Sequence, residues 1–397
     1  MKGICTWLCG VILFIVLLVV CRMFPFQLRW QGSLAVLVGG FAAASMVGFV
    51  VWFQVYTRRP KLLSAETIPP LLILLTEKNE GKRVLLSALR WLDYSPNIQV
   101  RVCDDHSQDD SVSLLEDCQA RFPGRFSWFP NDDPHAGKRH PKAFALEQTL
   151  RRSPRARYLL ILDADSQVSF PTLQRSLFSV EQHNLDVLSL TRRNTKPARP
   201  FSWMLADGEE LVLSFLKWWG IAAWVFPGSG IILRMDKARE LHVPTRLDSE
   251  DSWLGAQARQ KGWKIGRSLT EHCMEDAPPT LGKLLDQRAK WNRQAILFQL
   301  NNHPFQSLVF SAVFALFFAG LFSLGSVWGA AVLAVFGALT GLGWVLHMNL
   351  GTQKAPIAAW NALWGSLFLL FFQLPCSAGY FLLFPFLREK PRFSKTT

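Results

Sequence analysis

The sequence predicts an α/β domain with a mostly parallel sheet, set between two apolar ends that are suited to a membrane. Between residues 69 and 162, short β-rich runs alternate with amphipathic helical segments, the pattern of a parallel sheet whose strands are buried on both faces. Residues 1–55 and 305–387 are almost entirely apolar. Each end contains runs close to the roughly 20 residues that cross a bilayer.

The apolar runs divide the chain into three regions. We expect two transmembrane helices in residues 1–57, a cytoplasmic domain in residues 58–300, and about three further spans with a basic tail in residues 301–397. A cleaved signal peptide is the alternative for the first run. That run is preceded by only one basic residue, Lys2, and is followed by no small-x-small cleavage site, so an uncleaved anchor is favoured.

The net charge of +13 is assigned to membrane topology and not to nucleic acid, because no nucleic-acid motif is present. Arg58, Arg59 and Lys61 follow the second run, and such residues favour the cytoplasmic side. We therefore expect the middle domain on the cytoplasmic side of a bacterial inner membrane. Three simple spans would place the basic tail outside, whereas a hairpin broken at Pro375 would return it to the cytoplasm. The sequence is compatible with both arrangements.

Each element of the middle region is expected from its own pattern. The expected strands are residues 71–76, 99–103, 125–129, 158–162, 187–191 and 231–234. The expected helices are residues 81–92, 109–121, 142–151, 201–225, 248–259 and 280–300. The helix at 201–225 is rich in tryptophan, as in Trp203, and suits either a membrane interface or a buried core.

The seven cysteines are scattered and form no CxxC pair, so reduced thiols are expected. Glu271, His272 and Cys273 lie together but have no partner set with metal-ligand spacing. A structural role is favoured for these three residues.

Acidic and amide side chains follow three of the expected strands. They are Glu77 with Asn79, Asp104 with Asp105, and Asp163 with Asp165. Ligands bind at the carboxyl ends of parallel strands, so these residues predict one site assembled from several strand ends. No GxGxxG or GxxxxGK[ST] loop is present, which argues against an ordinary dinucleotide or P-loop fold.

Asp163 and Asp165 are candidate metal ligands. Side chains one residue apart point to opposite faces within a strand, but just past a strand end both can approach one cation. Mg²⁺ or Mn²⁺ held by one or two carboxylates and phosphate oxygens is the usual arrangement for phosphate substrates. A helix cap or a surface turn is the alternative for this short triplet.

The order of motifs from about Pro70 to Gln294 resembles the membrane-bound, processive-type family 2 glycosyltransferases, such as the synthases of chitin, hyaluronan, cellulose and poly-N-acetylglucosamine. The matching segments are TEKNE (76–80), DDHSQDDS (104–111), KAFAL (142–146), LDADS (162–166), PGSGIILR (227–234), SEDSWLG (249–255) and EDAPPTLGKLLDQRAKW (275–291). The resemblance implies a GT-A fold, a nucleotide-sugar donor and single displacement with inversion.

The resemblance also implies roles for individual residues. Donor-binding roles fall on Glu80, Asp104, Asp105, Lys142, Asp163, Gln287, Arg288, Lys290 and Trp291, metal-binding roles on Asp163 and Asp165, and the catalytic base on Asp251. These residue types suit the chemistry. A leaving diphosphate needs a metal and basic side chains, an acceptor hydroxyl needs a carboxylate base, and an acceptor sugar needs an aromatic platform such as Trp291.

The sequence departs from the family pattern at several positions. His106 and Pro141 stand where glycine is usual, and Lys290 replaces the arginine of QxxRW. Lysine keeps the charge but lacks the bidentate fork toward phosphate. The triplet from His140 to Lys142 resembles the NPK of ceramide-type glucosyltransferases.

We therefore expect a metal-dependent transferase that takes a sugar from a nucleotide sugar, a UDP-sugar by preference. A growing polysaccharide is the favoured acceptor and a membrane lipid the alternative. An inactive homologue that serves as a scaffold subunit is the alternative from another class.

Overall fold

The computed structural model describes residues 68–302, except 136–139, 153–154, 196–199, 219–225, 246 and 248. The apolar segments expected to span a membrane lie outside the described residues. Among the described residues, no helix has the length and apolar character to cross a bilayer.

A seven-stranded mixed sheet forms the centre of the domain, in the order β3-β2-β1-β4-β6-β5-β7. The strands are Leu71–Glu77 (β1), Ile98–Asp104 (β2), Phe126–Pro130 (β3), Tyr158–Asp163 (β4), Val187–Thr195 (β5), Ile231–Arg234 (β6) and Ile265–Asp276 (β7). Strands β3, β2, β1 and β4 are parallel, and β6 pairs antiparallel with both β4 and β5.

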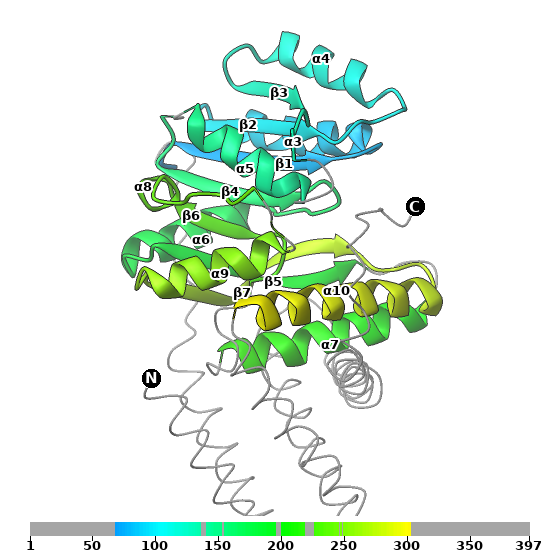
Figure 1. Ribbon diagram of the computed structural model, residues 1–397. Helices are drawn as coiled ribbons and strands as arrows, with labels where there is room; N and C mark the ends of the chain where they lie inside the picture. Colours follow the sequence, from blue (N-terminus) through cyan, green and yellow to red (C-terminus); the bar gives the residue numbers. More distant parts are fainter. Residues whose placement is uncertain are drawn as a thin grey trace, which may run out of the picture.

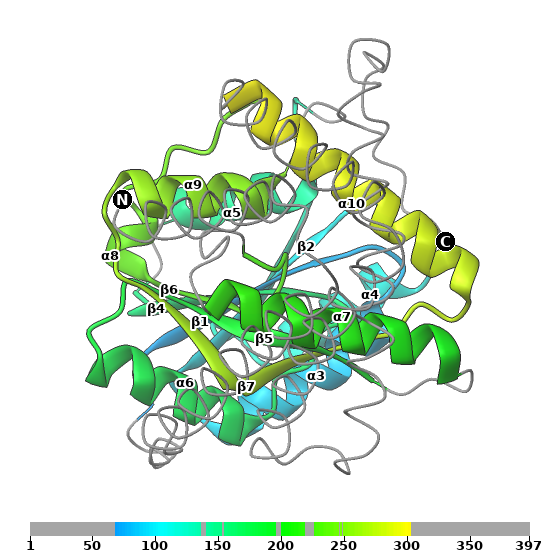
Figure 2. The same ribbon diagram turned by 90° about the horizontal axis from the view of Figure 1, so that it is seen from below.

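Helices cover both faces of the sheet (Figures 1 and 2). They are Gly81–Tyr94 (α3), Ser111–Arg121 (α4), Pro141–Arg151 (α5), Phe170–Gln182 (α6), Pro200–Trp218 (α7), Met235–Ala238 (α8), Glu250–Gln260 (α9) and Leu281–Asn302 (α10). One apolar core lies between the sheet and α3, α4 and α6, and a second lies between the sheet and α5, α8 and α9.

The side chains of β1 show how the sequence builds two cores from one strand. Leu71, Ile73 and Leu75 enter the first core, while Leu72 and Leu74 enter the second. Successive side chains point to opposite faces of a sheet, so a continuous apolar run suits a strand that is buried on both sides. The side chains of β4 alternate between the two cores in the same way, and the strand ends at Asp163.

Two long helices, α7 and α10, contact each other, and α7 packs against β5 and β7. Figure 1 shows both helices at the end of the sheet where β5 and β7 lie, opposite β3 and α4. Trp203 on α7 is 5% exposed and donates its indole N–H to the carbonyl of Asn194 at 2.9 Å. The buried-core alternative therefore holds for this tryptophan.

The expected strands and helices are confirmed with shifts at their ends. For the helix expected at 201–225, the end of the range, residues 219–225, lies outside the described residues. Helices α6 and α8 and the long strand β7 were not expected. Residues Glu271, His272 and Cys273 lie in β7, where Glu271 accepts a 2.7 Å hydrogen bond from Arg175.

Candidate active site

The carboxyl ends of β1, β2 and β4 meet at one edge of the sheet. In the parallel register Glu77 lies beside Asp104, and Thr76 lies beside Asp163. The acidic strand ends predicted from the sequence are therefore neighbours, as expected for a site at this edge of a parallel sheet.

Glu77 and Asp104 form a buried acidic pair at the first two strand ends. The backbone N–H of Ser107 donates to Asp104 Oδ1 and Oδ2 at 3.3 and 3.2 Å, and the Ser107 hydroxyl donates to Glu77 Oε1 at 3.3 Å. Burial, followed by hydrogen bonding and repulsion from Asp104, raises the pKa of Glu77 to about 7. Asp105 lies next to this pair and accepts a 2.7 Å hydrogen bond from the side-chain amide of Asn131.

Two turns at this edge have a left-handed backbone. The φ angles of Asn79 and His106 are +57° and +58°. Non-glycine residues rarely adopt such angles, and Asn and His are among the more tolerant. The preference for glycine at the position of His106 in the family pattern therefore has a steric reason, and this chain supplies a tolerated substitute.

Glu80, another predicted donor-binding residue, lies at the start of α3. Its carboxylate pairs with Arg83 at 3.1 Å, and its backbone N–H donates to Glu77 Oε2 at 3.0 Å. Arg83 also reaches Asp276 at the end of β7 at 2.8 Å. These contacts tie α3 to the far half of the sheet.

Lys142 lies at the centre of the site on the first turn of α5. Pro141 and the cap residue His140 begin that helix, a favourable start because proline fixes a helical φ without losing a needed hydrogen bond. The Lys142 Nζ atom is 2.7 Å from Asp163 Oδ1, 2.5 Å from the carbonyl oxygen of Gly228 and 3.6 Å from Glu250 Oε1. Burial lowers the pKa of Lys142, but attraction to Asp163 and Glu250 outweighs burial and raises it.

The turn after β4 presents both aspartates of the DAD triplet. The backbone N–H of Asp163 donates to Ser229 Oγ at 3.0 Å, and the N–H of Ser166 closes the turn onto the carbonyl of Asp163 at 3.0 Å. Burial, then repulsion from Asp163 and Glu80, raises the pKa of Asp165 to about 6. The closely spaced carboxylates of this partly exposed turn are hard oxygen donors and fit a divalent cation such as Mg²⁺ or Mn²⁺. Within the described ranges, no group of three or more His, Cys, Asp or Glu side chains forms a preassembled metal cluster.

Asp251, the predicted base, lies on the first turn of α9. Its Oδ1 atom accepts a 2.7 Å hydrogen bond from the N–H of Ser252 and another from the hydroxyl of Ser249. Burial, then repulsion from Glu250, raises the pKa of Asp251. Burial also raises the pKa of Glu250, but the charges of His140 and Lys142 outweigh it and lower that pKa.

Gly228 is the point at which these groups converge. A Cβ atom built on Gly228 would lie 3.3 Å from Lys142 Nζ and 3.9 Å from both Asp163 Oδ2 and Asp251 Oδ2. The predicted metal ligand, the predicted phosphate lysine and the predicted base therefore surround one backbone position. The turn before β6 must pass close to all three, and glycine leaves room for it.

The predicted residues of α10 lie in a different environment. Arg288 is 1% exposed; its Nε donates to Glu209 Oε2 on α7 at 2.6 Å, and its Nη1 donates to Gln287 at 2.7 Å. The half-buried Trp291 ring carries the Arg288 guanidinium at 4.2 Å from its centroid. Lys290 is half-buried on the same helix. The structure thus pairs Arg288 with two carboxylates of α7, those of Glu209 and Glu210.

The sequence prediction missed two residues between these groups, Glu275 and Arg192. Burial raises the pKa of Glu275 to about 8, with attraction to Arg192 opposing it and repulsion from Asp165 and Asp163 adding to it. Arg192 on β5 pairs with Glu275 and Glu210 and lies 4.2 Å from the Trp291 ring centroid. Glu275 is the first residue of the family-like segment 275–291, and this position in a motif could have identified it as a site residue. Arg192 had no comparable signal.

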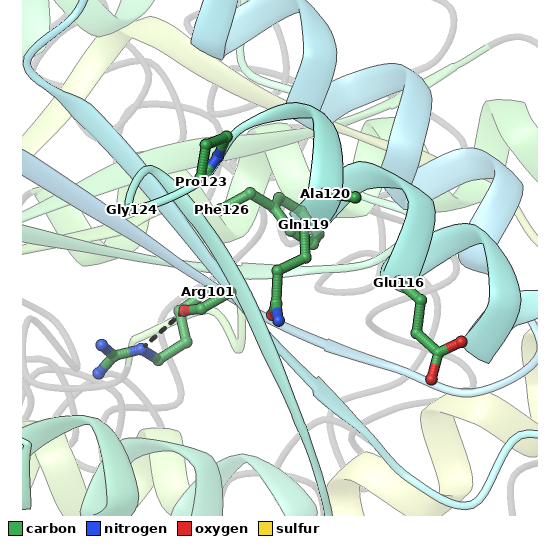
Figure 3. A pocket seen from close by; sticks show the side chains of 8 residues that line it. Arg101, Glu116, Gln119, Ala120, Pro123, Gly124 and Phe126 are labelled. Atoms are coloured by element: carbon green, nitrogen blue, oxygen red, sulfur yellow. Dashed lines mark hydrogen bonds between the residues drawn. The ribbon is translucent and has the colours of Figure 1, made fainter.

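A pocket also lies away from this edge, between α4 and strands β2 and β3 (Figure 3). Arg101, Gln119 and Phe126 are among the residues that line it. None of its lining residues belongs to the predicted site, and the Arg101 Nε donates to Ser127 at 3.4 Å.

One comparison with a solved structure supports this fold. The mannosyltransferase PcManGT of Pyrobaculum calidifontis, solved with GDP-Man and Mn²⁺, superimposes with a TM-score of 0.51 at 15% identity, covering 90% of this chain and 100% of that chain. TarS of S. aureus, residues 1–349, has a TM-score of 0.39 at 14% identity, covering 82% of this chain and 99% of that chain. Among curated proteins, no sequence matches this chain.

Two family descriptions match the sequence itself. Glycosyl transferase family 2 matches residues 75–239, which hold the first strand ends, Lys142, the aspartate pair and Gly228. Glycosyl transferase family group 2 matches residues 158–384, more than half of the chain. The chain therefore belongs to the family 2 glycosyltransferases.

Proposed function

We propose that this protein is a membrane-bound, inverting glycosyltransferase that moves a sugar from a UDP-sugar to a growing polysaccharide. Family membership and the GT-A-like sheet support transfer from a nucleotide sugar. The apolar ends and the basic residues that follow residue 57 support a membrane enzyme with a cytoplasmic catalytic domain.

The arrangement around Gly228 carries the proposal. Asp163 Oδ2 and Asp251 Oδ2 each lie 3.9 Å from the position that a Cβ atom on Gly228 would occupy. Lys142 Nζ lies 3.3 Å from that position. Inverting transfer needs a base on the acceptor side and positive charge on the side of the leaving diphosphate. A constellation that gathers a carboxylate base, a cation and a second carboxylate around one point meets this requirement.

Asp251 is the general base in this proposal. Its Oδ1 is engaged by Ser249 and Ser252, which fixes the side chain, while Oδ2 faces the point beside Gly228. The raised pKa of Asp251 makes it a better proton acceptor than an ordinary aspartate. It takes the proton of the acceptor hydroxyl as that oxygen attacks the anomeric carbon and the nucleoside diphosphate leaves.

Asp163 and Asp165 would hold Mg²⁺ or Mn²⁺. A divalent cation supplies charge that neutralises the leaving diphosphate. The structure of the mannosyltransferase from Pyrobaculum calidifontis with GDP-Man and Mn²⁺ supports this assignment by analogy of fold. Lys142 adds a positive charge beside Asp163. Asp104 and Asp105 would bind the nucleoside, as the resemblance of their motif to the family pattern implies.

Arg288 and Trp291 belong to the acceptor and diphosphate side of the proposal. Arg288 is paired with Glu209, so its predicted contact with a diphosphate requires an exchange of partners. Gln287 and Lys290 lie on the same helix and would approach the donor with it.

A membrane lipid is the second candidate acceptor. The His140–Lys142 triplet and Lys290 resemble ceramide-type enzymes and favour it. Purified full chain incubated with radiolabelled UDP-sugars separates the two by product length. A ladder of products supports the polysaccharide and excludes single transfer, whereas one glycolipid product contradicts the polysaccharide.

The same assay tests the scaffold alternative. An inactive homologue would neither transfer nor hydrolyse any nucleotide sugar. Retention of Asp163, Asp165 and Asp251 together argues against that alternative, because loss of any one would disable the proposed chemistry.

A further inference from the structure

A continuous line of polar contacts runs from the turn after β4 to helix α10. It passes through Glu275 at the end of β7, a residue to which the proposed chemistry gives no part. Its members are Asp163, Ser229, Ser166, Glu275, Arg192, Glu210, Arg288 and Trp291. The line joins the proposed metal-binding turn to the helix that carries the proposed acceptor platform.

The first half of the line is made of hydroxyl groups. Ser229 accepts from the N–H of Asp163 at 3.0 Å and donates to Ser166 Oγ at 2.7 Å, and Ser166 Oγ donates to Glu275 Oε1 at 3.4 Å. Ser166 and Ser229 are completely buried. Each hydroxyl therefore has a fixed partner, which gives the turn a defined conformation.

The backbone fixes the same junction independently. The N–H of Gln167 donates to the carbonyl of Met274 at 2.7 Å, and the N–H of Met274 donates back at 2.8 Å. This pair of bonds places Ser166 and Glu275 on adjacent segments. The contact between their side chains therefore follows from the main-chain pairing.

The second half of the line consists of contacts between carboxyl and guanidinium groups. Glu275 Oε2 lies 3.5 Å from Arg192 Nη1, and Arg192 Nη2 also pairs closely with Glu210 Oε1. Arg288 Nη2 lies 3.9 Å from that same Glu210 oxygen. Both guanidinium groups lie 4.2 Å from the centroid of the Trp291 ring.

We propose that Glu275 is a positioning residue that holds the turn of Asp163 and Asp165 in register with helix α10, through Ser166 on one side and Arg192 on the other. The inference rests on the proposed function, because it assigns that turn to the metal. Glu275 touches neither donor nor acceptor in this proposal. Groups behind metal ligands orient those ligands, and their loss typically costs about 10- to 100-fold in metal affinity.

Mn²⁺ binding to the purified full chain in the presence of UDP tests the proposal. We expect Glu275→Ala to weaken Mn²⁺ binding about tenfold and to raise the KM for the UDP-sugar more than it lowers kcat. Glu275→Gln keeps an oxygen for Ser166 and should keep much of the metal affinity. Ser166→Ala, a smaller change on the opposite side of the same contact, should weaken Mn²⁺ binding to a similar degree.

Glu271→Ala is the matched control. Glu271 lies on the same strand, is 2% exposed and pairs with Arg175, but has no contact with the metal-binding turn among those described. If Glu271→Ala and Glu275→Ala weaken Mn²⁺ binding equally, the effect is general destabilisation and the proposal is wrong.

A double variant tests the connection itself. Changes within one network are not additive, whereas independent changes are. Ser166→Ala should weaken Mn²⁺ binding much less in the Glu275→Ala background than in the wild type. If Ser166→Ala weakens Mn²⁺ binding by the same factor in both backgrounds, the proposed connection between Ser166 and Glu275 is wrong. If the wild-type chain binds no Mn²⁺ with UDP, the proposed function fails instead, so the two failures are distinct.

Discussion

At the level of single residues, the site is a small, unbalanced cluster of charges. One ammonium group, Lys142, lies against Asp163 at 2.7 Å and Glu250 at 3.6 Å, with Asp251 close behind them. Buried carboxylates without full compensation bind protons or cations more strongly than exposed ones. Burial, followed by repulsion from neighbouring carboxylates, raises the pKa values of Asp165 and Asp251.

Asp251→Asn is expected to lower the rate of sugar transfer by about 10²- to 10⁴-fold, because the amide cannot accept the proton of the acceptor hydroxyl. The change is nearly isosteric, so the hydrogen bond from the Ser252 N–H to Oδ1 can remain. Transfer assays and UDP affinity should be measured together. Full activity in this variant would remove Asp251 from the role of base.

Mn²⁺ binding is expected to tighten as the pH rises from 5 to 7. The pKa of Asp165 is about 6, and protons compete with a metal for a carboxylate. Asp165→Asn should bind Mn²⁺ with UDP more weakly and lose most of this pH dependence. Calorimetric titrations of both proteins at several pH values measure the effect, and identical curves would exclude Asp165 as a ligand.

Glu77 is expected to make the folded state less stable as the pH rises. Its pKa is about 7 in the folded protein against an ordinary value of 4.5. A carboxyl group with a raised pKa stabilises the fold below about pH 4.5, and that contribution is lost as the pH rises through about 7. Glu77→Gln should therefore gain stability relative to wild type between these pH values. Thermal unfolding of both proteins at pH 4.5, 6 and 7.5 tests this. A difference in unfolding temperature between variant and wild type that is the same at all three pH values would contradict the prediction.

At the level of elements, β6 is the strand that completes the site. It lies antiparallel between β4 and β5, so the turn that precedes it arrives at the carboxyl end of β4. That turn carries Gly228 beside Lys142, and Ser229, which accepts from the N–H of Asp163. Gly228 and Gly230 of this turn lie in different surroundings, so alanine substitutions at the two positions should have different effects.

Gly228→Ala should impair donor binding with little loss of stability, because the added Cβ meets Lys142 Nζ at 3.3 Å. Gly230→Ala should destabilise the fold, since φ is +74° and the Cβ would lie 2.8 Å from Cys273 Cβ. A left-handed non-glycine residue alone costs about 1–3 kcal/mol. Unfolding temperatures and the KM for the UDP-sugar distinguish the two, and the opposite ranking would refute this division of tasks.

The sequence predicted the elements with a strong local signal and missed those that depend on tertiary pairing. The continuous apolar runs of β1 and β4 and the acids that follow them are local features, so the site edge could be predicted. Strand β7 has no regular alternation, and its pairing with β5 is interrupted by a register shift between Ser189 and Thr191. The pairing of Arg288 with Glu209 joins residues 79 positions apart, and motif spacing carries no information about such a partner.

At the level of the whole molecule, the described domain is one part of a longer chain. Its two halves meet at β4 and β6: parallel strands with the strand-end acids lie on one side, and β5, β7, α7 and α10 lie on the other. Helix α10 ends at Asn302, shortly before the apolar sequence that begins at residue 305. An acceptor platform on α10 would thus be close in sequence to the proposed membrane region.

The full chain is expected to remain in the membrane fraction after an alkaline carbonate wash, because residues 1–55 and 305–387 contain apolar runs of spanning length. Arg58, Arg59 and Lys61 predict that the catalytic domain faces the cytoplasm. In inside-out membrane vesicles, protease should therefore cleave residues 68–302, whereas in intact spheroplasts those residues should be protected. Replacing the three basic residues with glutamine should weaken this orientation, because positive charge next to a span favours the cytoplasmic side. Release by carbonate would refute the membrane anchor, and cleavage in spheroplasts would refute the orientation alone.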